Sequence, residues 1–108
     1  MSSVTFADVQ AAEKRIQSYV NHTPILESQL LNEWLGHQVI FKAECFQKTG
    51  AFKLRGALNM LLKAKEEGRL GKRVVANSSG NHAQAVAYAA NILGVRATIY
   101  SGRNISKV

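Results

Sequence analysis

The last third of the sequence constrains the fold most, because an apolar helix lies there between two short segments rich in β-branched residues. Residues 73–77 (RVVAN) and 95–100 (VRATIY) are typical of strands. Residues 81–93 (NHAQAVAYAANIL) predict an apolar helix that ends before Gly94. A strand, a helix and a second strand in this order form a right-handed crossover between parallel strands. The sequence therefore predicts an α/β fold.

The N-terminal part of the chain predicts two helices. Thr5 and Asp8 have the spacing of a capping box, with Asp in place of the usual Glu. The apolar residues that follow recur at helical spacing, so we expect an amphipathic helix over residues 6–20. Ser28 can cap a second, short helix, and Gly36 is a natural end for it.

The middle of the chain predicts a further strand and a further helix. Residues 38–45 (QVIFKAEC) alternate between apolar and polar side chains, as a strand does. After a turn, apolar residues at helical spacing begin at Leu54 and predict a helix that ends near Gly68. Together with the C-terminal crossover, this order predicts a partial open parallel sheet of three strands with packed helices.

Composition indicates a soluble, cytoplasmic protein. Hydrophobic residues make up 46% of the 108 residues, which is enough for a core. The single cysteine, Cys45, excludes an internal disulfide and fits a reducing compartment. No stretch reaches the ~20 apolar residues that span a bilayer, and the N-terminus lacks the blocks of a signal peptide. We expect no membrane partner.

The formal net charge of +7 raises the question of nucleic-acid binding. A binder of this kind usually has a basic stripe with interleaved aromatic residues, whereas the densest basic group here contains none and is interrupted by two glutamates. We therefore interpret this group as a solvated helix end and expect no nucleic-acid partner. Its members are Lys63, Lys65, Arg69, Lys72 and Arg73.

A turn with the sequence SSGN, Ser78 to Asn81, joins a predicted strand to a predicted helix. Ligands of parallel sheets bind at the carboxyl ends of strands, and the N–H groups that begin the next helix bind anions. Ser78, Ser79 and Asn81 add polar side chains, and Gly80 lets the backbone approach a ligand. The alternative is an ordinary capped turn.

His82, which follows this turn, is a candidate base or ligand, and a structural, hydrogen-bonded histidine is the alternative. The other two histidines, His22 and His37, stand alone in the sequence. One cysteine and scattered histidines provide no plausible set of metal ligands. The sequence therefore predicts no metal site within this chain.

Lys53 follows the segment TGAF at the start of a predicted helix. The helix dipole disfavours a cation there, and partial burial beside Phe52 acts in the same direction. Both favour the neutral amine, which attacks carbonyl groups. Arg55 and Lys48 are expected to add positive field nearby. The alternative is a surface lysine with its charge in water.

Two long motifs, FKAECFQKTGAFKLRGALN and NSSGNHAQAVAYAA, together with the opening TFADVQAAEKRIQSYVNHTPIL, resemble the fold-type II pyridoxal-phosphate enzymes. The resemblance is to the group of serine racemases, serine/threonine dehydratases and hydroxyaspartate dehydratases. It implies that Lys53 forms the Schiff base with pyridoxal 5'-phosphate and carries a proton on one face of the substrate. Ser79 would serve the opposite face.

The resemblance also implies further roles around that lysine. Phe52 would pack near the cofactor ring, and Asn81 would bind the phenolic oxygen of the ring. The pocket for the α-carboxylate of a small hydroxy amino acid would be formed by Ser78, Ser79, Asn81 and His82. The implied activity is a dehydratase (ammonia-lyase), a racemase, or both, acting on serine, threonine or 3-hydroxyaspartate, in a protein that is a homo-oligomer.

Family chains are about three times as long, so the resemblance implies a truncated chain, the N-terminal third. Residues 1–46 would belong to the larger domain, and residues 47–108 would be the first part of the small α/β domain with the Schiff-base lysine. The glycine-rich phosphate loop and the divalent-metal site of the racemase-like group would lie outside this chain. The alternative is a non-catalytic remnant or interaction module that folds by self-association.

Overall fold

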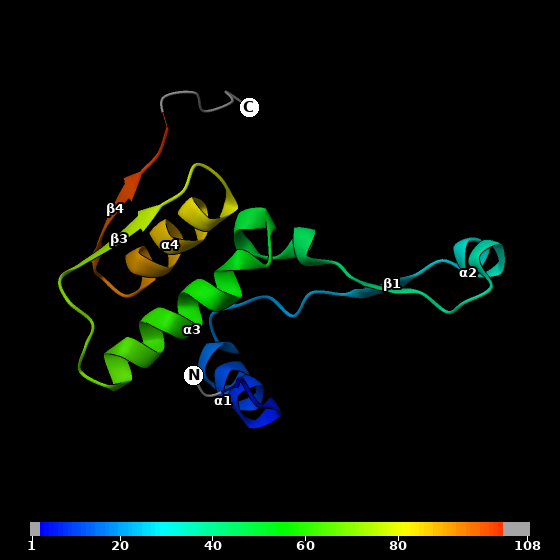
Figure 1. Cartoon of the computed structure of the whole chain (residues 1–108), viewed down its shortest axis with the longest axis horizontal. Helices are drawn as coiled ribbons and strands as arrows, with labels where there is room; N and C mark the ends of the chain where they lie inside the picture. The colour runs from blue at the N-terminus through cyan, green and yellow to red at the C-terminus, as the bar shows by residue number, and fades with distance from the viewer. Residues whose placement is uncertain (1–2, 103–108) are drawn as a thin grey trace.

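The structure, a computed structural model, describes residues 3–102. Figure 1 shows a body with an arm extending from one side of it. The radius of gyration is 16.8 Å, well above the ~13 Å of a compact 100-residue domain. In chain order, the helices and strands are α1 (Phe6–Ile16), β1 (Ile25–Glu27), α2 (Gln29–Leu35), β2 (Ile40–Lys42), the 3₁₀ turns η1 (Glu44–Phe46) and η2 (Lys48–Gly50), α3 (Lys53–Glu66), β3 (Arg73–Asn77), α4 (Asn81–Ile92) and β4 (Arg96–Tyr100).

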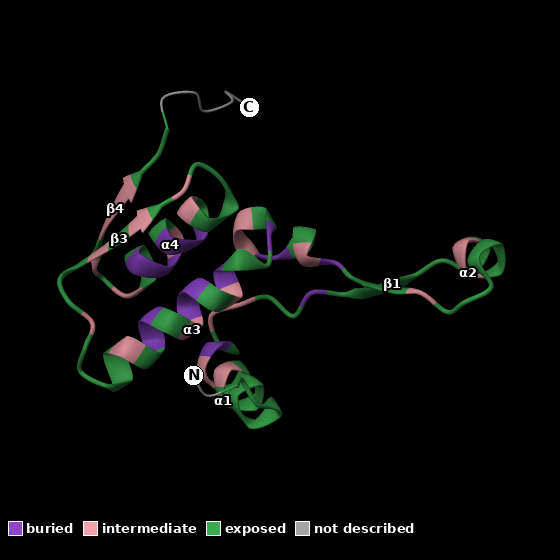
Figure 2. Ribbon diagram, in the orientation of Figure 1, coloured by how far each residue is buried: buried purple, intermediate pink, exposed green. Residues whose placement is uncertain are grey.

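The body is layered, with β3 and β4 against α4, α4 against α3, and α1 against α3 away from α4 (Figure 1). Buried residues follow the facing sides of α3 and α4 (Figure 2). Leu54 and Leu58 of α3 are fully buried, at 0% exposure, against alanines of α4 such as Ala85 and Ala89. The small alanine side chains allow the two helices to approach closely. Each buried leucine contributes about 1.5–3 kcal/mol to folding.

The parallel sheet consists of β3 and β4, aligned from Arg73 opposite Arg96 to Asn77 opposite Tyr100. One face lies on α4, and its side chains pack against the core. The opposite face is open, with Val75 62% and Tyr100 63% exposed. The core-facing side chains are Val74, Ala76, Ala97 and Ile99. This alternation confirms both predicted strands.

The arm consists of β1 and β2, which pair antiparallel, with α2 between them. The hydroxyl of Ser28 accepts a hydrogen bond from the Leu31 N–H at 3.3 Å, and Gly36 ends α2 with φ of 68°. Both confirm the predicted cap and stop. Nearly all of the arm is exposed (Figure 2), including Trp34 at 81%.

The prediction of a third strand in the parallel sheet is wrong. Residues 38–45 contribute only β2, and β2 pairs with β1 in a separate antiparallel sheet. Its partner is local because the chain, after the turns that follow α1, extends at Pro24 into β1. The Ala43 N–H donates to the Pro24 carbonyl at 3.0 Å and continues this ladder. The coarser prediction of a mixed helix and strand fold is confirmed.

The predicted helix over residues 6–20 begins as expected but ends early. The Thr5 N–H donates to Asp8 Oδ2 at 2.8 Å, and the Asp8 N–H donates to Thr5 Oγ1 at 3.3 Å, which confirms the capping box. The helix stops at Ile16, because the Tyr19 N–H bonds the Ile16 carbonyl three residues back in a tighter turn. In residues 3–102 no helix has the length and apolar character needed to cross a membrane.

Candidate functional site

Lys53 is the first residue of α3, and its side chain is exposed. The Lys53 Nζ lies 5.0 Å from the centre of the Phe52 ring, a cation–π distance. The expected partial burial beside Phe52 is wrong for the described chain, since Phe52 is itself 59% exposed. The reason is the orientation of α3. Leu54 and Leu58 lie on the face that packs on α4, and Lys53 lies on a face that is exposed.

The loop before Lys53 has an unusual backbone. Thr49 and Gly50 have φ of 67° and 70°, so two consecutive residues adopt the left-handed conformation. Among the described residues, Thr49 is the sole non-glycine residue with positive φ. Its Oγ1 is buried and has no hydrogen-bond partner there. Such a conformation is costly for a β-branched residue, so this turn persists only because its surroundings hold it.

The SSGN turn begins at the carboxyl end of β3. The Ser78 N–H donates to the Tyr100 carbonyl at 2.9 Å and so extends the sheet by one residue. The Gly80 N–H donates to Ser78 Oγ at 3.3 Å. Ser78 is half-buried, and the other polar residues of the predicted site are exposed: Ser79, Asn81 and His82.

The start of α4 is open. Gly80 occupies the N-cap position, and no side chain caps the helix, although a capped turn was the alternative interpretation of SSGN. The first N–H groups of a helix have no partner within it. A Cβ added at Gly80 would meet no atom within 4 Å, so a group can approach the backbone here.

The starts of α3 and α4 lie at the same end of the body (Figure 1), and η2, directly before α3, contacts α4. Lys53 and the residues from Ser78 to His82 are therefore brought to one end of the molecule. This is the end at which the parallel strands finish. The structure thus brings the starts of the two helices, and not only the two sequence motifs, to one end of the body.

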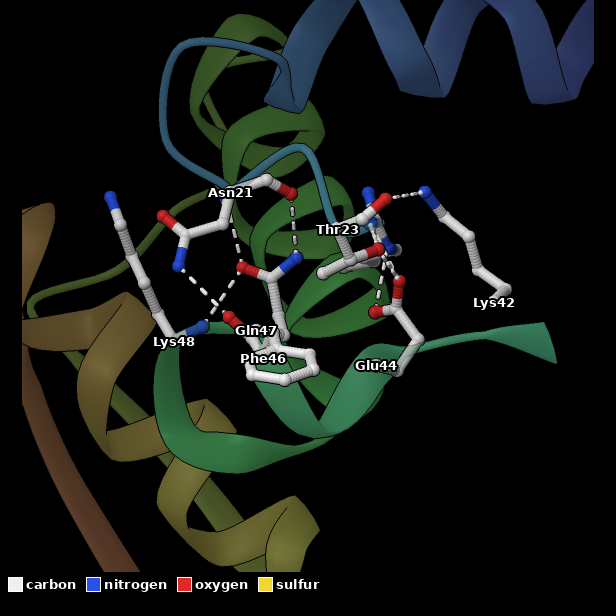
Figure 3. A network of polar contacts seen from close by, with 8 residues as sticks. Asn21, Thr23, Lys42, Glu44, Phe46, Gln47 and Lys48 are labelled. Atoms are coloured by element: carbon white, nitrogen blue, oxygen red, sulfur yellow. Dashed lines mark hydrogen bonds and ion pairs between the residues drawn. The ribbon is translucent and has the colours of Figure 1, made fainter. Parts of the chain in front are cut away.

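An ion pair between Arg55 and Glu44 joins the first turn of α3 to η1. Arg55 Nε and Nη2 donate to Glu44 Oε2 and Oε1 at 3.0 and 2.8 Å. The Thr23 hydroxyl donates to Glu44 Oε1 at 2.6 Å, and Lys42 Nζ donates to the Thr23 carbonyl at 2.6 Å. Figure 3 shows Thr23, Lys42 and Glu44 converging in this network. Thr23 is almost fully buried, at 5% exposure.

A buried carboxamide, that of Gln47, joins the segment after α1 to the turns before α3. Gln47 Oε1 accepts from the N–H groups of Asn21 and Lys48 at 2.9 and 3.0 Å, and its Nε2 donates to the Asn21 carbonyl at 3.0 Å (Figure 3). Lys48 Nζ donates to the Tyr19 carbonyl at 2.8 Å. Because Gln47 is 4% exposed, these bonds are shielded from water and rigidify the approach to α3.

The electrostatics of the ion pair correct one expectation. Hydrogen bonding to Arg55 lowers the pKa of Glu44, and the same bond raises the pKa of Arg55. Arg55 and Lys48 were expected to add positive field near Lys53. Arg55 is instead paired with a carboxylate, whereas Lys48 keeps its charge and donates to a backbone carbonyl. Neither Glu44 nor Gln47 had any local sequence signal for this role, because their partners are distant in the chain.

Metal-ligating residues do not gather in the part of the chain that the structure describes. Within residues 3–102, no three or more His, Cys, Asp or Glu side chains lie together in a way that could hold a metal ion. Cys45, His22 and His37 are exposed.

Comparisons with known proteins agree with this geometry. Residues 16–108 match the family described as "Pyridoxal-phosphate dependent enzyme". The L-threo-3-hydroxyaspartate ammonia-lyase of Saccharomyces cerevisiae is 55% identical over 95 residues, which cover 88% of this chain and 29% of that protein.

Two solved structures are also similar. Maize serine racemase matches with a TM-score of 0.89 and 42% identity, over 97% of this chain and 32% of that one. The threonine deaminase of T.th. matches with a TM-score of 0.78 and 48% identity, over 89% of this chain and 33% of that one. The chain therefore spans about a third or less of the length of these relatives.

Proposed function

The chain belongs to the pyridoxal-phosphate-dependent enzymes, and we propose that it forms the part of such an enzyme that carries the cofactor-binding lysine, Lys53. The activity we propose is that of a dehydratase (ammonia-lyase), a racemase, or both, on serine, threonine or 3-hydroxyaspartate. The names of the relatives support this substrate class: an ammonia-lyase for hydroxyaspartate, a serine racemase and a threonine deaminase.

The residues present fit pyridoxal phosphate. Lys53 is an exposed primary amine able to bond to an aldehyde, and the Phe52 ring beside it offers an apolar face. The open space over Gly80 and the exposed Asn81 leave room for a flat ring near the start of α4. When bound, this cofactor supplies an electron sink that acidifies the Cα–H bond of an amino acid.

The chain's own residues would bind the substrate and move its protons. The uncapped start of α4 would bind the α-carboxylate, since helix N-termini attract anions, with help from Ser78, Asn81 and His82. Lys53 Nζ would take the proton from Cα on one face. The Ser79 hydroxyl would return a proton on the opposite face when the outcome is racemisation.

One observation carries this proposal: the starts of α3 and α4 lie at the same end of the body, with a lysine at one and a helix start without a side-chain cap at the other. Its test uses pyridoxal phosphate as the probe, followed by borohydride reduction and peptide mapping of the labelled lysines. Lys63 is exposed on the same helix and serves as the internal reference.

We expect Lys53 to be labelled well ahead of Lys63, and Lys53→Ala to reduce total labelling to the background of the remaining lysines. Lys63→Ala is the matched control and should leave the Lys53 label unchanged. Equal labelling of Lys53 and Lys63 would contradict the proposal. Incubation with serine, threonine and threo-3-hydroxyaspartate, with assay of keto acid and of the inverted amino acid, then separates the dehydratase from the racemase.

The proposal extends to the organisation of the whole protein. Residues 1–46 would belong to the larger domain and residues 47–108 to the small domain, in a homo-oligomeric, cytoplasmic protein. Exposed apolar side chains of the arm support a covered position in that assembly, since such surface is costly in water. A divalent-metal site would lie outside this chain.

A further inference from the structure

We propose that Glu44 is a positioning residue for Lys53, an inference that rests on the function proposed above. Its carboxylate holds the Arg55 guanidinium, and this ion pair fixes the first turn of α3 against η1, which the Thr23 hydroxyl in turn joins to the segment that follows α1. Nothing in the motif itself assigns a role to Glu44, which lies nine residues before the lysine.

The geometry of the ion pair fixes the orientation of the Arg55 guanidinium as well as its distance from Glu44. Two parallel N–H···O bonds at 3.0 and 2.8 Å fix the plane of the guanidinium relative to the carboxylate. The Thr23 hydroxyl adds a third bond to the same carboxylate at 2.6 Å. The side chain of Glu44 is 17% exposed and that of Arg55 32%, so the carboxylate is the better shielded of the two groups.

Besides the Gln47 network, which holds the chain before it, the start of α3 has few other means of fixing its orientation. Phe52, at the N-cap position, makes no side-chain capping bond, and the loop before it contains the left-handed Thr49 and Gly50. Within the first turn, Leu54 is fully buried on one side and Arg55 is paired on the other. Lys53 is thus followed directly by a residue with an apolar contact, Leu54, and by one with an ionic contact, Arg55.

Loss of the ionic anchor is expected to release the first turn of α3. In Glu44→Gln, a neutral amide replaces the carboxylate, so the charge-assisted bonds are lost while the shape is kept. Leu54 still holds the helix to α4, and we expect the chain to remain folded. The Lys53 side chain would then point toward the proposed site less of the time.

The chain offers a matched control on the same helix. Arg15 Nε lies 2.9 Å from Glu66 Oε2, an ion pair that joins α1 to the opposite end of α3. Glu66→Gln removes the same charge and an ion-pair contact far from Lys53, although this contact is a single bond to a more exposed carboxylate. Any general effect of losing a glutamate from an ion pair of α3 appears in both variants.

The experiment labels each full chain with pyridoxal phosphate, reduces it with borohydride, and measures two quantities. The first is the ratio of label at Lys53 to label at Lys63. The second is the circular dichroism that the bound cofactor acquires per labelled Lys53, which reports a fixed orientation and does not follow stability alone. In Glu44→Gln we expect the ratio to fall about tenfold, the scale of a charge-assisted hydrogen bond, and the induced signal to shrink. Glu66→Gln should match the unaltered chain.

The outcomes separate this inference from the function on which it rests. If the unaltered chain shows no preference for Lys53, the proposed function fails. If it shows the preference and Glu44→Gln keeps both quantities, only the positioning role is overturned. Should Glu44→Gln not fold, Thr23→Val provides the test instead, because it removes the bonds of the Thr23 hydroxyl to Glu44 and to Arg55 Nη2 and leaves the ion pair itself. A smaller loss in the same direction supports the role, and an unchanged ratio overturns it.

Discussion

Thr23 Oγ1 lies 2.6 Å from Glu44 Oε1, and this hydrogen bond joins the extended segment after α1 to the turn that leads into α3. The same carboxylate binds Arg55 of α3. A single ionised group therefore connects three parts of the chain that are separate in sequence. The charge state of Glu44 is consequently expected to affect folding stability.

The first prediction is a loss of stability in acid that depends on Glu44. Hydrogen bonding to Arg55 lowers the pKa of Glu44 below its usual 4.5, with further lowering from Thr23 and from the charges of Arg55 and Lys42. The stabilisation is fully present above pH 4.5 and disappears as the pH falls through the lower pKa of the folded state.

Urea unfolding at a series of pH values, for the unaltered chain and Glu44→Gln, measures this contribution. Other carboxylates contribute to both curves, so the difference between the two isolates Glu44. We expect the difference in free energy of unfolding to be largest near neutral pH and to narrow below pH 4.5. A difference that stays constant far below that pH would show that ionisation of Glu44 does not stabilise the fold.

The second prediction concerns the strained turn before Lys53. Thr49→Gly removes a β-branched side chain from φ of 67° and also removes a buried hydroxyl without a partner. Relief of this strain exceeds the added flexibility of glycine, so we expect the free energy of unfolding to rise by about 1 kcal/mol.

Thr49→Val is the informative comparison, because it keeps the branched side chain and removes only the hydroxyl. If backbone strain dominates, Thr49→Gly is more stable than Thr49→Val in the same urea titration. A destabilised glycine variant would mean that the threonine side chain makes contacts worth more than the strain.

The third prediction tests the core that supports the site. Leu58 is fully buried between α3 and α4, so Leu58→Ala should lower the free energy of unfolding by about 2 to 5 kcal/mol through lost burial and a cavity. Met60 lies on the same helix but is 72% exposed, and Met60→Ala should change stability by less than about 0.5 kcal/mol. If both variants lost a similar free energy of unfolding, Leu58 would not be part of the hydrophobic core.

The elements that the sequence predicted well are those defined by local pattern. The bounds of β3 match residues 73–77, because a short β-branched segment between polar turns has few other conformations. The strand β1 was not predicted, since its three residues have no pattern of their own and depend on β2 for pairing. The wrong parallel placement of residues 38–45 has the same origin, because strand partners are chosen by tertiary contacts.

The candidate site was also predicted from sequence only in part. Lys53 and the turn from Ser78 to Asn81 were identified from residue types at expected helix starts, and the fold brings those starts to one end. The pairing of Glu44 with Arg55 was not foreseen, because the two residues are 11 positions apart on different elements. Arg55, close to Lys53 in sequence, suggested added positive field, and only the folded arrangement shows that its charge is paired with Glu44.

The last prediction separates a binding role from a folding role at Gly80. Its φ of −129° lies outside the left-handed region, and an added Cβ would meet no atom within 4 Å. Gly80→Ala should therefore change the free energy of unfolding by no more than about 0.5 kcal/mol, the modest cost of alanine at an N-cap.

The added methyl group would nevertheless occupy the open space at the start of α4 and hinder a ligand there. We expect labelling of Lys53 by pyridoxal phosphate to fall while urea unfolding is nearly unchanged, with Gly71→Ala, in the loop before β3, leaving both measurements as they were. Undiminished labelling in Gly80→Ala would mean that the cofactor does not approach this turn.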